Sequence, residues 1–84
     1  MIADIGRLIE LLGRGIMSVQ FPSRTAAIVK CRHGIVFYLY RRNDRYDLYE
    51  YDGGKIYVLC KQIPTVNKVY DRMCKEHGCL KEYV

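Results

Sequence analysis

The chain has 84 residues, of which half are hydrophobic and 12% aromatic, and this composition excludes an intrinsically disordered protein. The length predicts one domain, residues 1–84, with a single hydrophobic core. Fourteen lysines and arginines stand against nine acidic residues, and the net charge of +5 favours anionic partners such as nucleic acid or an acidic protein surface.

Residues 2–13 are predicted to form an amphipathic helix. Apolar side chains recur at steps of three and four residues, with one more beside them: Ile2, Ile5, Ile9, Leu12 and Leu8. Asp4 falls in the first turn, where a negative charge suits the helix dipole. Gly13 and Gly15 are typical of a helix end.

The next segment, residues 16–34, allows two interpretations. Pro22 and Ser23 interrupt whatever element precedes them. Residues 25–31 either form a strand or form a short helix capped by Ser23 and closed by Gly34. We favour the strand, because β-branched residues dominate the middle of this segment and the aromatic run that follows it.

A three-stranded meander is predicted over Ile35–Arg42, Arg45–Tyr51 and Lys55–Gln62, which are rich in aromatic and β-branched residues. Asn43-Asp44 and Asp52-Gly53-Gly54 separate these segments and are typical of hairpin turns. With the strand expected before it, the meander predicts an antiparallel sheet of three to four strands.

A second helix is predicted after Pro64, with Thr65 as its N-cap and Gly78 just past its end. Its apolar stripe consists of Val66, Val69, Tyr70, Met73, Cys74 and His77. The tail, Cys79–Val84, is expected to pack loosely. The elements together predict an α+β fold in which the N- and C-terminal helices pack on one face of the sheet.

A two-residue turn at Asn43-Asp44 places Tyr38 opposite Tyr49, because directly opposed residues share a face of the sheet. The second turn decides how the last strand joins. A two-residue turn at 53–54 puts Ile56, Val58 and Cys60 beside the tyrosines, whereas a three-residue loop at 52–54 moves those three to the aliphatic face. We favour the three-residue loop, because it separates polar from apolar residues better.

In this register one face of the sheet gathers five tyrosines and four cations, and the other face is aliphatic. The first face consists of Tyr38, Tyr40, Tyr49, Tyr51 and Tyr57, rimmed by Arg42, Arg45, Lys55 and Lys61. Glu50 falls on the aliphatic side, which disfavours the register unless this carboxylate lies at the rim.

Aromatic rings among cations on an open sheet can stack bases while the cations hold phosphates. We therefore expect DNA or RNA binding, with phosphate contacts from Arg41, Arg42, Arg45, Lys55 and Lys61 and stacking on the five tyrosines. The basic turn, residues 41–45, could also enter a groove as the wing of a winged helix does, if residues 24–33 are helical. The alternative function is an interaction module that forms a homodimer or binds an acidic protein through the same face.

Metal and catalytic motifs are weak. Cysteine and histidine are good zinc ligands, but Cys31-x-His33 and the stretch 74–79 contain no paired Cys-x2-Cys, so we expect no metal. None of the few serines and threonines lies in a nucleophile motif, and Gly13-Arg14-Gly15 is too short for a phosphate loop. We expect neither a cofactor nor an enzymatic activity.

The order helix, three strands, helix is also that of double-stranded-RNA-binding domains. The start of the second helix, residues 65–68, lacks the basic character typical of those domains, so we do not transfer their function.

The location of the protein is expected to be cytoplasmic. The first residues lack the basic start and apolar block of a signal peptide, and the longest apolar run, residues 35–40, is far shorter than the roughly 20 residues of a membrane span. The cysteines do not follow the regular framework of small secreted domains; they are Cys31, Cys60, Cys74 and Cys79. We expect them to be structural, as buried thiols or as a native disulfide, and we expect no membrane association.

Amides are scarce, whereas arginine, lysine, tyrosine and isoleucine are abundant, a bias that suits high temperature. In composition the chain resembles the small orphan proteins of hyperthermophilic archaea and their viruses. This resemblance implies a hyperthermophilic source and, for a viral protein, the host cytoplasm. It implies no functional residue.

Overall fold

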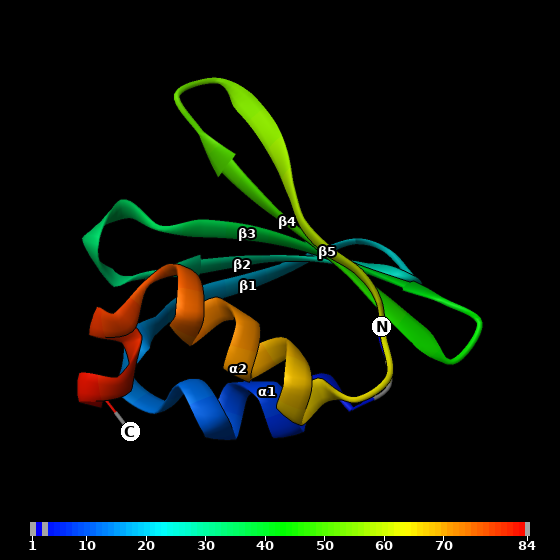
Figure 1. Cartoon of the computed structure of the whole chain (residues 1–84), viewed down its shortest axis with the longest axis horizontal. Helices are drawn as coiled ribbons and strands as arrows, with labels where there is room; N and C mark the ends of the chain where they lie inside the picture. The colour runs from blue at the N-terminus through cyan, green and yellow to red at the C-terminus, as the bar shows by residue number, and fades with distance from the viewer. Residues whose placement is uncertain (1, 3, 84) are drawn as a thin grey trace.

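The computed structural model describes Ile2 and residues 4–83 of the chain. In this part, α1 (Ile5–Leu12) and α2 (Val66–Glu76) lie side by side on one face of an antiparallel sheet, so the predicted α+β fold is confirmed (Figure 1). The described strands number five rather than three to four, and they lie in sequence order: β1 (Ile16–Ser23), β2 (Ala26–Cys31), β3 (Val36–Arg42), β4 (Arg45–Asp52) and β5 (Lys55–Ile63).

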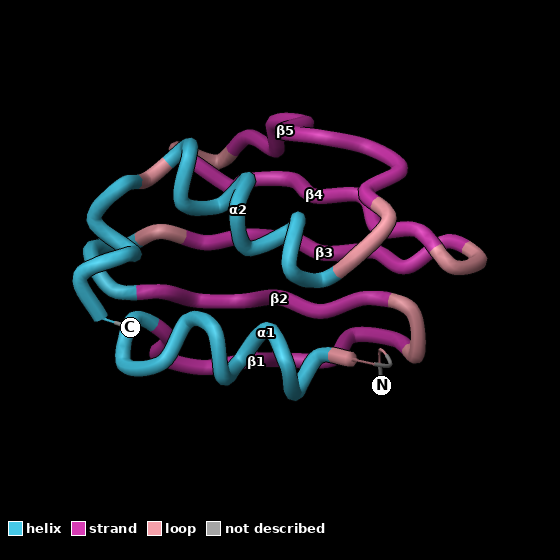
Figure 2. Tube along the Cα trace, turned by 60° about the horizontal axis from the view of Figure 1, so that its bottom comes forward, coloured by secondary structure: helices cyan, strands magenta, loops and turns pink. Residues whose placement is uncertain are grey.

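The strands at 16–23 and 26–31 resolve the ambiguous segment. The strand interpretation of residues 25–31 is confirmed, and the helix that a winged-helix protein would need is excluded. The sequence missed β1, which lies beside β2 along the edge of the sheet (Figure 2). Pro22 is tolerated near its end because an edge strand leaves one row of backbone groups unpaired. Five strands between the helices also remove the likeness to the double-stranded-RNA-binding topology.

The first helix begins later than predicted, at Ile5. Its buried residues are Ile5, Leu8 and Leu12, whereas Ile9, expected in the stripe, is exposed. Asp4 is the N-cap, and its carboxylate accepts a hydrogen bond from the Tyr46 hydroxyl at 3.2 Å rather than capping the helix itself. Ala3 and Val84, which fall in the predicted helix and tail, lie outside the described residues.

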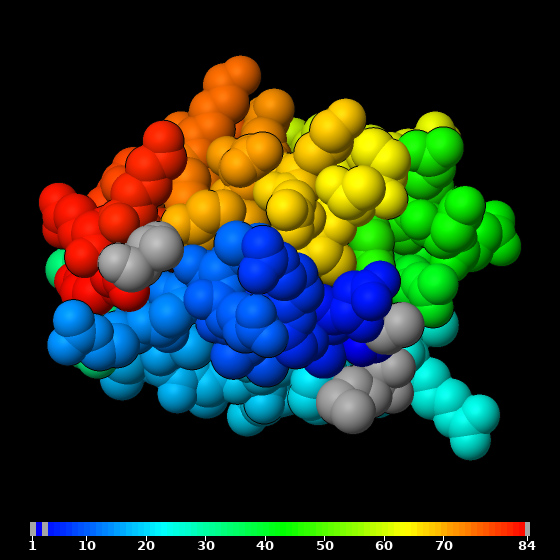
Figure 3. All heavy atoms as spheres, turned by 90° about the horizontal axis from the view of Figure 1, so that it is seen from below, coloured from blue at the N-terminus to red at the C-terminus, as the bar shows by residue number. Residues whose placement is uncertain are grey.

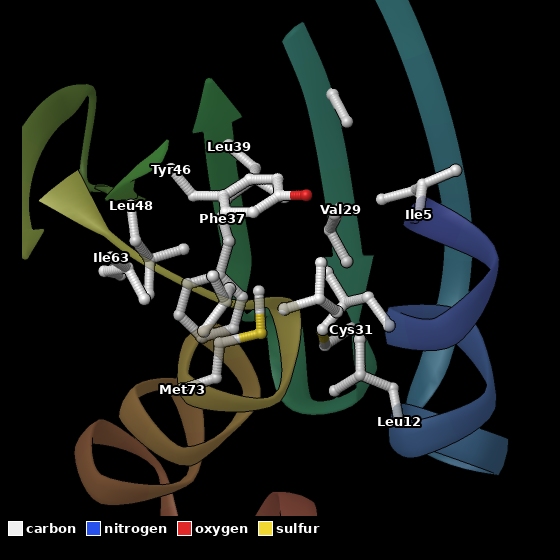
Figure 4. Close-up of a cluster of buried hydrophobic side chains, with 14 of the residues drawn as sticks. Ile5, Leu12, Val29, Cys31, Phe37, Leu39, Tyr46, Leu48, Ile63 and Met73 are labelled. Carbon is white, nitrogen blue, oxygen red and sulfur yellow. The ribbon is translucent and has the colours of Figure 1, made fainter. Parts of the chain in front are cut away.

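The second helix follows the prediction closely. The Thr65 hydroxyl accepts a hydrogen bond from the Lys68 backbone N–H at 3.2 Å, which confirms the N-cap. Met73 is fully buried, and its side chain meets Phe37 and other sheet residues that point toward the helices (Figure 4). The other buried side chains of the helix are Val66, Val69 and Cys74.

The prediction that the tail packs loosely is wrong, because it forms a 3-10 helix over Gly78–Tyr83. Leu80 is fully buried in the core. Tyr83 lies against the β2–β3 connection, with its hydroxyl 2.7 Å from His33 Nε2 and the Arg32 guanidinium 5.4 Å from its ring centre. The tail therefore extends the helical layer, and α1, α2 and the tail form one continuous surface on this side of the sheet (Figure 3).

The predicted register of β3 and β4 is confirmed, including Tyr38 opposite Tyr49 and Arg42 opposite Arg45. The favoured register of β5 is wrong near the turn. Asp52 pairs with Lys55 across a two-residue turn at Gly53-Gly54, and both glycines have positive φ, as a type I′ turn requires.

Two irregularities in the pairing of β4 with β5 then turn side chains near the end of β5 toward the core. Val58 pairs with Tyr49, but Cys60 pairs with Leu48, so Leu59 is an extra residue in a β-bulge. A second irregularity, at 61–62, brings Ile63 opposite Tyr46. Because each inserted residue reverses the side-chain alternation, Cys60 lies with the aliphatic set as predicted.

Glu50 lies on the helix-covered face, and a partner explains its place there. Its two carboxylate oxygens lie 2.9 and 2.8 Å from His77 Nε2, at the C-terminal end of α2. The His77 ring also meets Phe37 edge-on, with 5.9 Å between ring centres. A carboxylate on the apolar face is thus paired rather than isolated, as burial of a charge requires.

Candidate nucleic-acid interface

The face of the sheet away from α1 and α2 is covered by no described helix (Figure 1). Cross-strand pairing places its side chains in rows. The middle row runs from β1 to β5 through Gln20, Ile28, Tyr38, Tyr49 and Val58. The neighbouring row runs through Ser18, Lys30, Val36, Tyr51 and Ile56. Four of the five predicted tyrosines, Tyr38, Tyr40, Tyr49 and Tyr51, therefore share this open face.

The four rings form two diagonal pairs. Tyr38 and Tyr51 are stacked, with ring centres 6.0 Å apart and planes at 15°. Tyr40 and Tyr49 meet edge to face, at 5.6 Å and 89°. Tyr38 and Tyr49 are half-buried in these contacts, whereas Tyr40 and Tyr51 are 44% and 40% exposed. The outer rings, Tyr40 and Tyr51, are thus held by an inner ring and still present a free surface.

A basic pocket adjoins the tyrosines at the β3–β4 turn. It has a volume of about 270 Å³, and its lining residues are Arg42, Asn43, Arg45, Asp47, Lys61 and Gln62. Three of these side chains are cations and one is an acid, so the pocket carries an excess of positive charge. Three strands supply the cations: Arg42 ends β3, Arg45 begins β4 and Lys61 lies near the end of β5.

Asp47 forms the floor of this pocket and is almost completely buried. Its Oδ1 accepts a hydrogen bond from the Gln62 backbone N–H at 2.9 Å, and its Oδ2 lies 3.7 Å from Arg42 Nη2. Gln62 has a positive φ of 57°, a conformation uncommon for a residue other than glycine. Asp47 therefore holds the irregularity of β5 and the pocket wall in place. The Arg45–Asp44 ion pair, at 3.9 Å on the surface, contributes little.

Three of the predicted contact residues lie elsewhere. Tyr57 pairs with Glu50 and therefore faces the opposite side from the other tyrosines, because the two-residue turn reversed the expected alternation. Arg41 alternates with Arg42, lies on the helix side and is half-buried beside Asp4 and Tyr46. Lys55 pairs with Asp52 at the β4–β5 turn, so it lies at the far end of β4 from Arg45.

The structure adds three residues that the sequence prediction missed. Lys30 pairs with Val36 and so lies on the open face, a position that the alternation of side chains along a strand at 25–31 predicts. Ile56 and Val58 join the tyrosines because the turn has two residues, the length that Gly53-Gly54 favours, rather than the expected three.

The four cysteines are free thiols, and the described residues contain no group of three or more His, Cys, Asp or Glu placed to hold a metal ion. Burial, with smaller contributions from Cys79 and Cys74, raises the pKa of Cys31 to about 11. None of the helices in the described part of the chain is long and apolar enough to span a membrane.

We expect Cys31 to resist alkylation in the native protein. With a pKa of about 11, only about one thiol in a thousand is ionised at pH 8, and the thiolate is the reactive species. In a time course with iodoacetamide followed by peptide mass spectrometry, the half-buried Cys60 and Cys79 should react before Cys31 and Cys74. In denaturant all four should react at similar rates. Early modification of Cys31 in the folded protein would contradict its burial.

Comparison with known proteins supplies no function for this surface. No family model, no curated protein and no solved structure matches the chain.

Proposed function

We propose that the protein binds single-stranded nucleic acid along the open face of its sheet. The observation that carries the proposal is the exposed ring of Tyr40, which stands opposite Asp47 at the floor of a pocket with three converging cations. The exposed ring of Tyr51 continues the tyrosine surface farther along β4. A ring on an open sheet can stack an unpaired base, and stacking accepts every base because each has a π-face. Arg42, Arg45 and Lys61 would hold the phosphates of the same strand.

The arrangement favours single strands over a duplex. Stacking requires bases that are not already stacked in a helix, and the tyrosines belong to the paired strands of the open face rather than to a protruding element. The β3–β4 turn, the protruding basic element, presents only Arg42 and Arg45 toward this face, because Arg41 points to the other side.

Binding should be measured with single- and double-stranded DNA and RNA at two salt concentrations. The proposal predicts binding to single strands that weakens as salt rises, because cations that neutralise phosphates release counterions. Replacing Arg42 and Arg45 together with glutamine should reduce the slope of log K against log salt by about 0.7 for each phosphate contact removed. Tyr40→Ala should weaken binding by about 1–3 kcal/mol with little change in that slope, because stacking releases few counterions.

Matched controls are available for both changes. Arg14→Gln with Lys81→Gln removes the same charge from the helical end of the molecule and should leave the salt slope nearly unchanged. Tyr57→Ala removes an equally exposed ring from the opposite side of the sheet and should leave single-strand binding intact. The absence of binding to all four nucleic acids at low salt would refute the proposal.

The alternative, a protein interface on the same tyrosine face, gives a different pattern. Loss of a protein complex on Tyr40→Ala, with insensitivity to salt and to the Arg42 and Arg45 changes, would favour it over nucleic-acid binding.

A further inference from the structure

The β4–β5 hairpin exposes apolar side chains on both of its faces. Ile56 and Val58, on the tyrosine side, are 55% and 58% exposed, and Tyr57, on the other side, is 49% exposed. The hairpin rises from the rest of the sheet on the side away from the helices, so the helical layer does not cover its tip (Figure 1). Ile56 and Val58 lie beside the proposed nucleic-acid surface but offer nothing to a phosphate.

The two edges of the sheet differ in how they are protected against pairing. β1 carries Pro22 and two register irregularities, features that disfavour the addition of another strand. The first part of β5, residues 55–58, pairs regularly with β4 and contains no proline. A regular, apolar edge of this kind is a template for another strand.

The backbone of this edge is complementary to a second copy of itself. Residues next to a two-residue turn form a hydrogen-bonded pair, and hydrogen-bonded and non-hydrogen-bonded pairs then alternate along an antiparallel ladder. Since Asp52 and Lys55 flank the turn, the N–H and C=O groups of Ile56 and Val58 point to the free edge. An antiparallel pairing centred on Tyr57 joins Ile56 of each copy to Val58 of the other through these free groups.

The side chains agree with the same register. Ile56 of one copy lies opposite Val58 of the other on the tyrosine side, and the two Tyr57 rings meet on the helix side. Lys55 lies opposite Leu59, so no two like charges are directly opposed. The register therefore brings the apolar side chains exposed on residues 56–58 of both copies into contact with one another.

The base of β5 offers a complementary place for the turn of the second copy. Beside it lies a groove of about 320 Å³, lined by Cys60, Lys61, Gln62, Ile63, Pro64, Lys68, Asp71, Arg72 and Lys75. Gly54 of a second copy in this register comes level with Cys60. Its turn brings the exposed Asp52 to a groove in which lysines outnumber acids, and the groove offers Asp71 to Lys55 of the same turn.

We infer that the protein forms a two-fold symmetric homodimer by antiparallel pairing of β5 with β5 of a second copy, centred on Tyr57. The two-fold axis is perpendicular to the local sheet, so both tyrosine faces and both basic pockets lie on the same side of the dimer. Dimerisation through this edge leaves Tyr40, Arg42 and Arg45 free, unlike a dimer that uses the tyrosine face.

Sedimentation velocity of the full chain over a range of concentrations tests the inference. The wild type should sediment as a dimer, at twice the chain mass of 9.9 kDa, and Val58→Lys should raise the dissociation constant at least about tenfold. Met17→Lys introduces a lysine at a similarly exposed apolar residue of the other edge strand, β1. It is the control and should leave the dimer intact. Circular dichroism should show that both variants are folded.

Hydrogen exchange provides a second readout that is specific to the register. The amides of Ile56 and Val58 should be protected at high protein concentration and should exchange rapidly on dilution, whereas the amide of Tyr57 should stay protected by β4 in both conditions. A monomeric wild type, equal loss of dimer in both lysine variants, or exchange at Ile56 and Val58 that is independent of concentration would each overturn the inference. Because none of these measurements uses nucleic acid, they succeed or fail independently of the proposed function.

Discussion

Met73→Ala is expected to lower the free energy of unfolding by about 2–5 kcal/mol. The side chain is fully buried where α2 meets the sheet, and its removal leaves a cavity that the surrounding residues fill only in part (Figure 4). In a chain of this size, 1 kcal/mol corresponds to a shift of roughly 4–8 °C in melting temperature, so the midpoint should fall by at least about 8 °C. Thermal unfolding followed by circular dichroism measures this shift.

Met17→Ala is the matched control, since Met17 is 62% exposed on the edge strand β1. This change removes the same atoms from a solvated site and should alter the free energy of unfolding by no more than about 0.5 kcal/mol. Equal melting temperatures for the Met73 variant and the wild type would show that α2 does not pack as described.

His77→Ala is expected to lower the free energy of unfolding by about 1–3 kcal/mol, chiefly because it leaves the Glu50 carboxylate without its hydrogen-bond partner. The Glu50 carboxylate is mostly buried on the helix-covered face. Among the described residues, His77 Nε2 is its only hydrogen-bond partner. Without the imidazole, the carboxylate loses that partner while its burial persists. Urea unfolding of the single variant measures the cost.

A double-mutant cycle separates the energy of the Glu50–His77 contact from the energy lost when the imidazole no longer packs on Phe37. Glu50→Gln replaces the charge with a neutral amide, so the double variant should be more stable than the sum of the two single effects implies. Effects that add to within about 0.5 kcal/mol would mean that the 2.8 Å contact carries no net stability.

The local elements were largely predictable because short-range chemistry specifies them. Thr65 as a helix N-cap and Gly13 as a helix end follow from the conformations and hydrogen bonds those residues favour. The β3–β4 register followed from a two-residue turn and the alternation of side chains. The strand β1 was missed because it contains proline and serine at its end, and its edge position is what makes them tolerable.

The candidate site was predictable only in part. Tyr38, Tyr40, Tyr49 and Tyr51 were placed together correctly because they lie on two strands whose register the first turn specifies. Tyr57 was placed wrongly because its face depends on the length of the second turn, and a difference of one residue reverses every side chain that follows. The preference of Gly53-Gly54 for a type I′ turn indicates the correct length, whereas the separation of polar from apolar residues favours the longer loop.

The sequence by itself determined the fold class, both helices, the three-stranded meander and the excess of positive charge, since each depends on residues close together in the chain or on composition. Only the tertiary structure decided where the basic pocket forms, because Asp47 on β4 must meet the Gln62 backbone on β5 before Arg42, Arg45 and Lys61 converge. It also decided how Glu50 is paired, through a histidine 27 residues away. Such contacts depend on bulges and on the packing of α2 against the sheet, and these minimise the free energy of the whole chain rather than of any one segment.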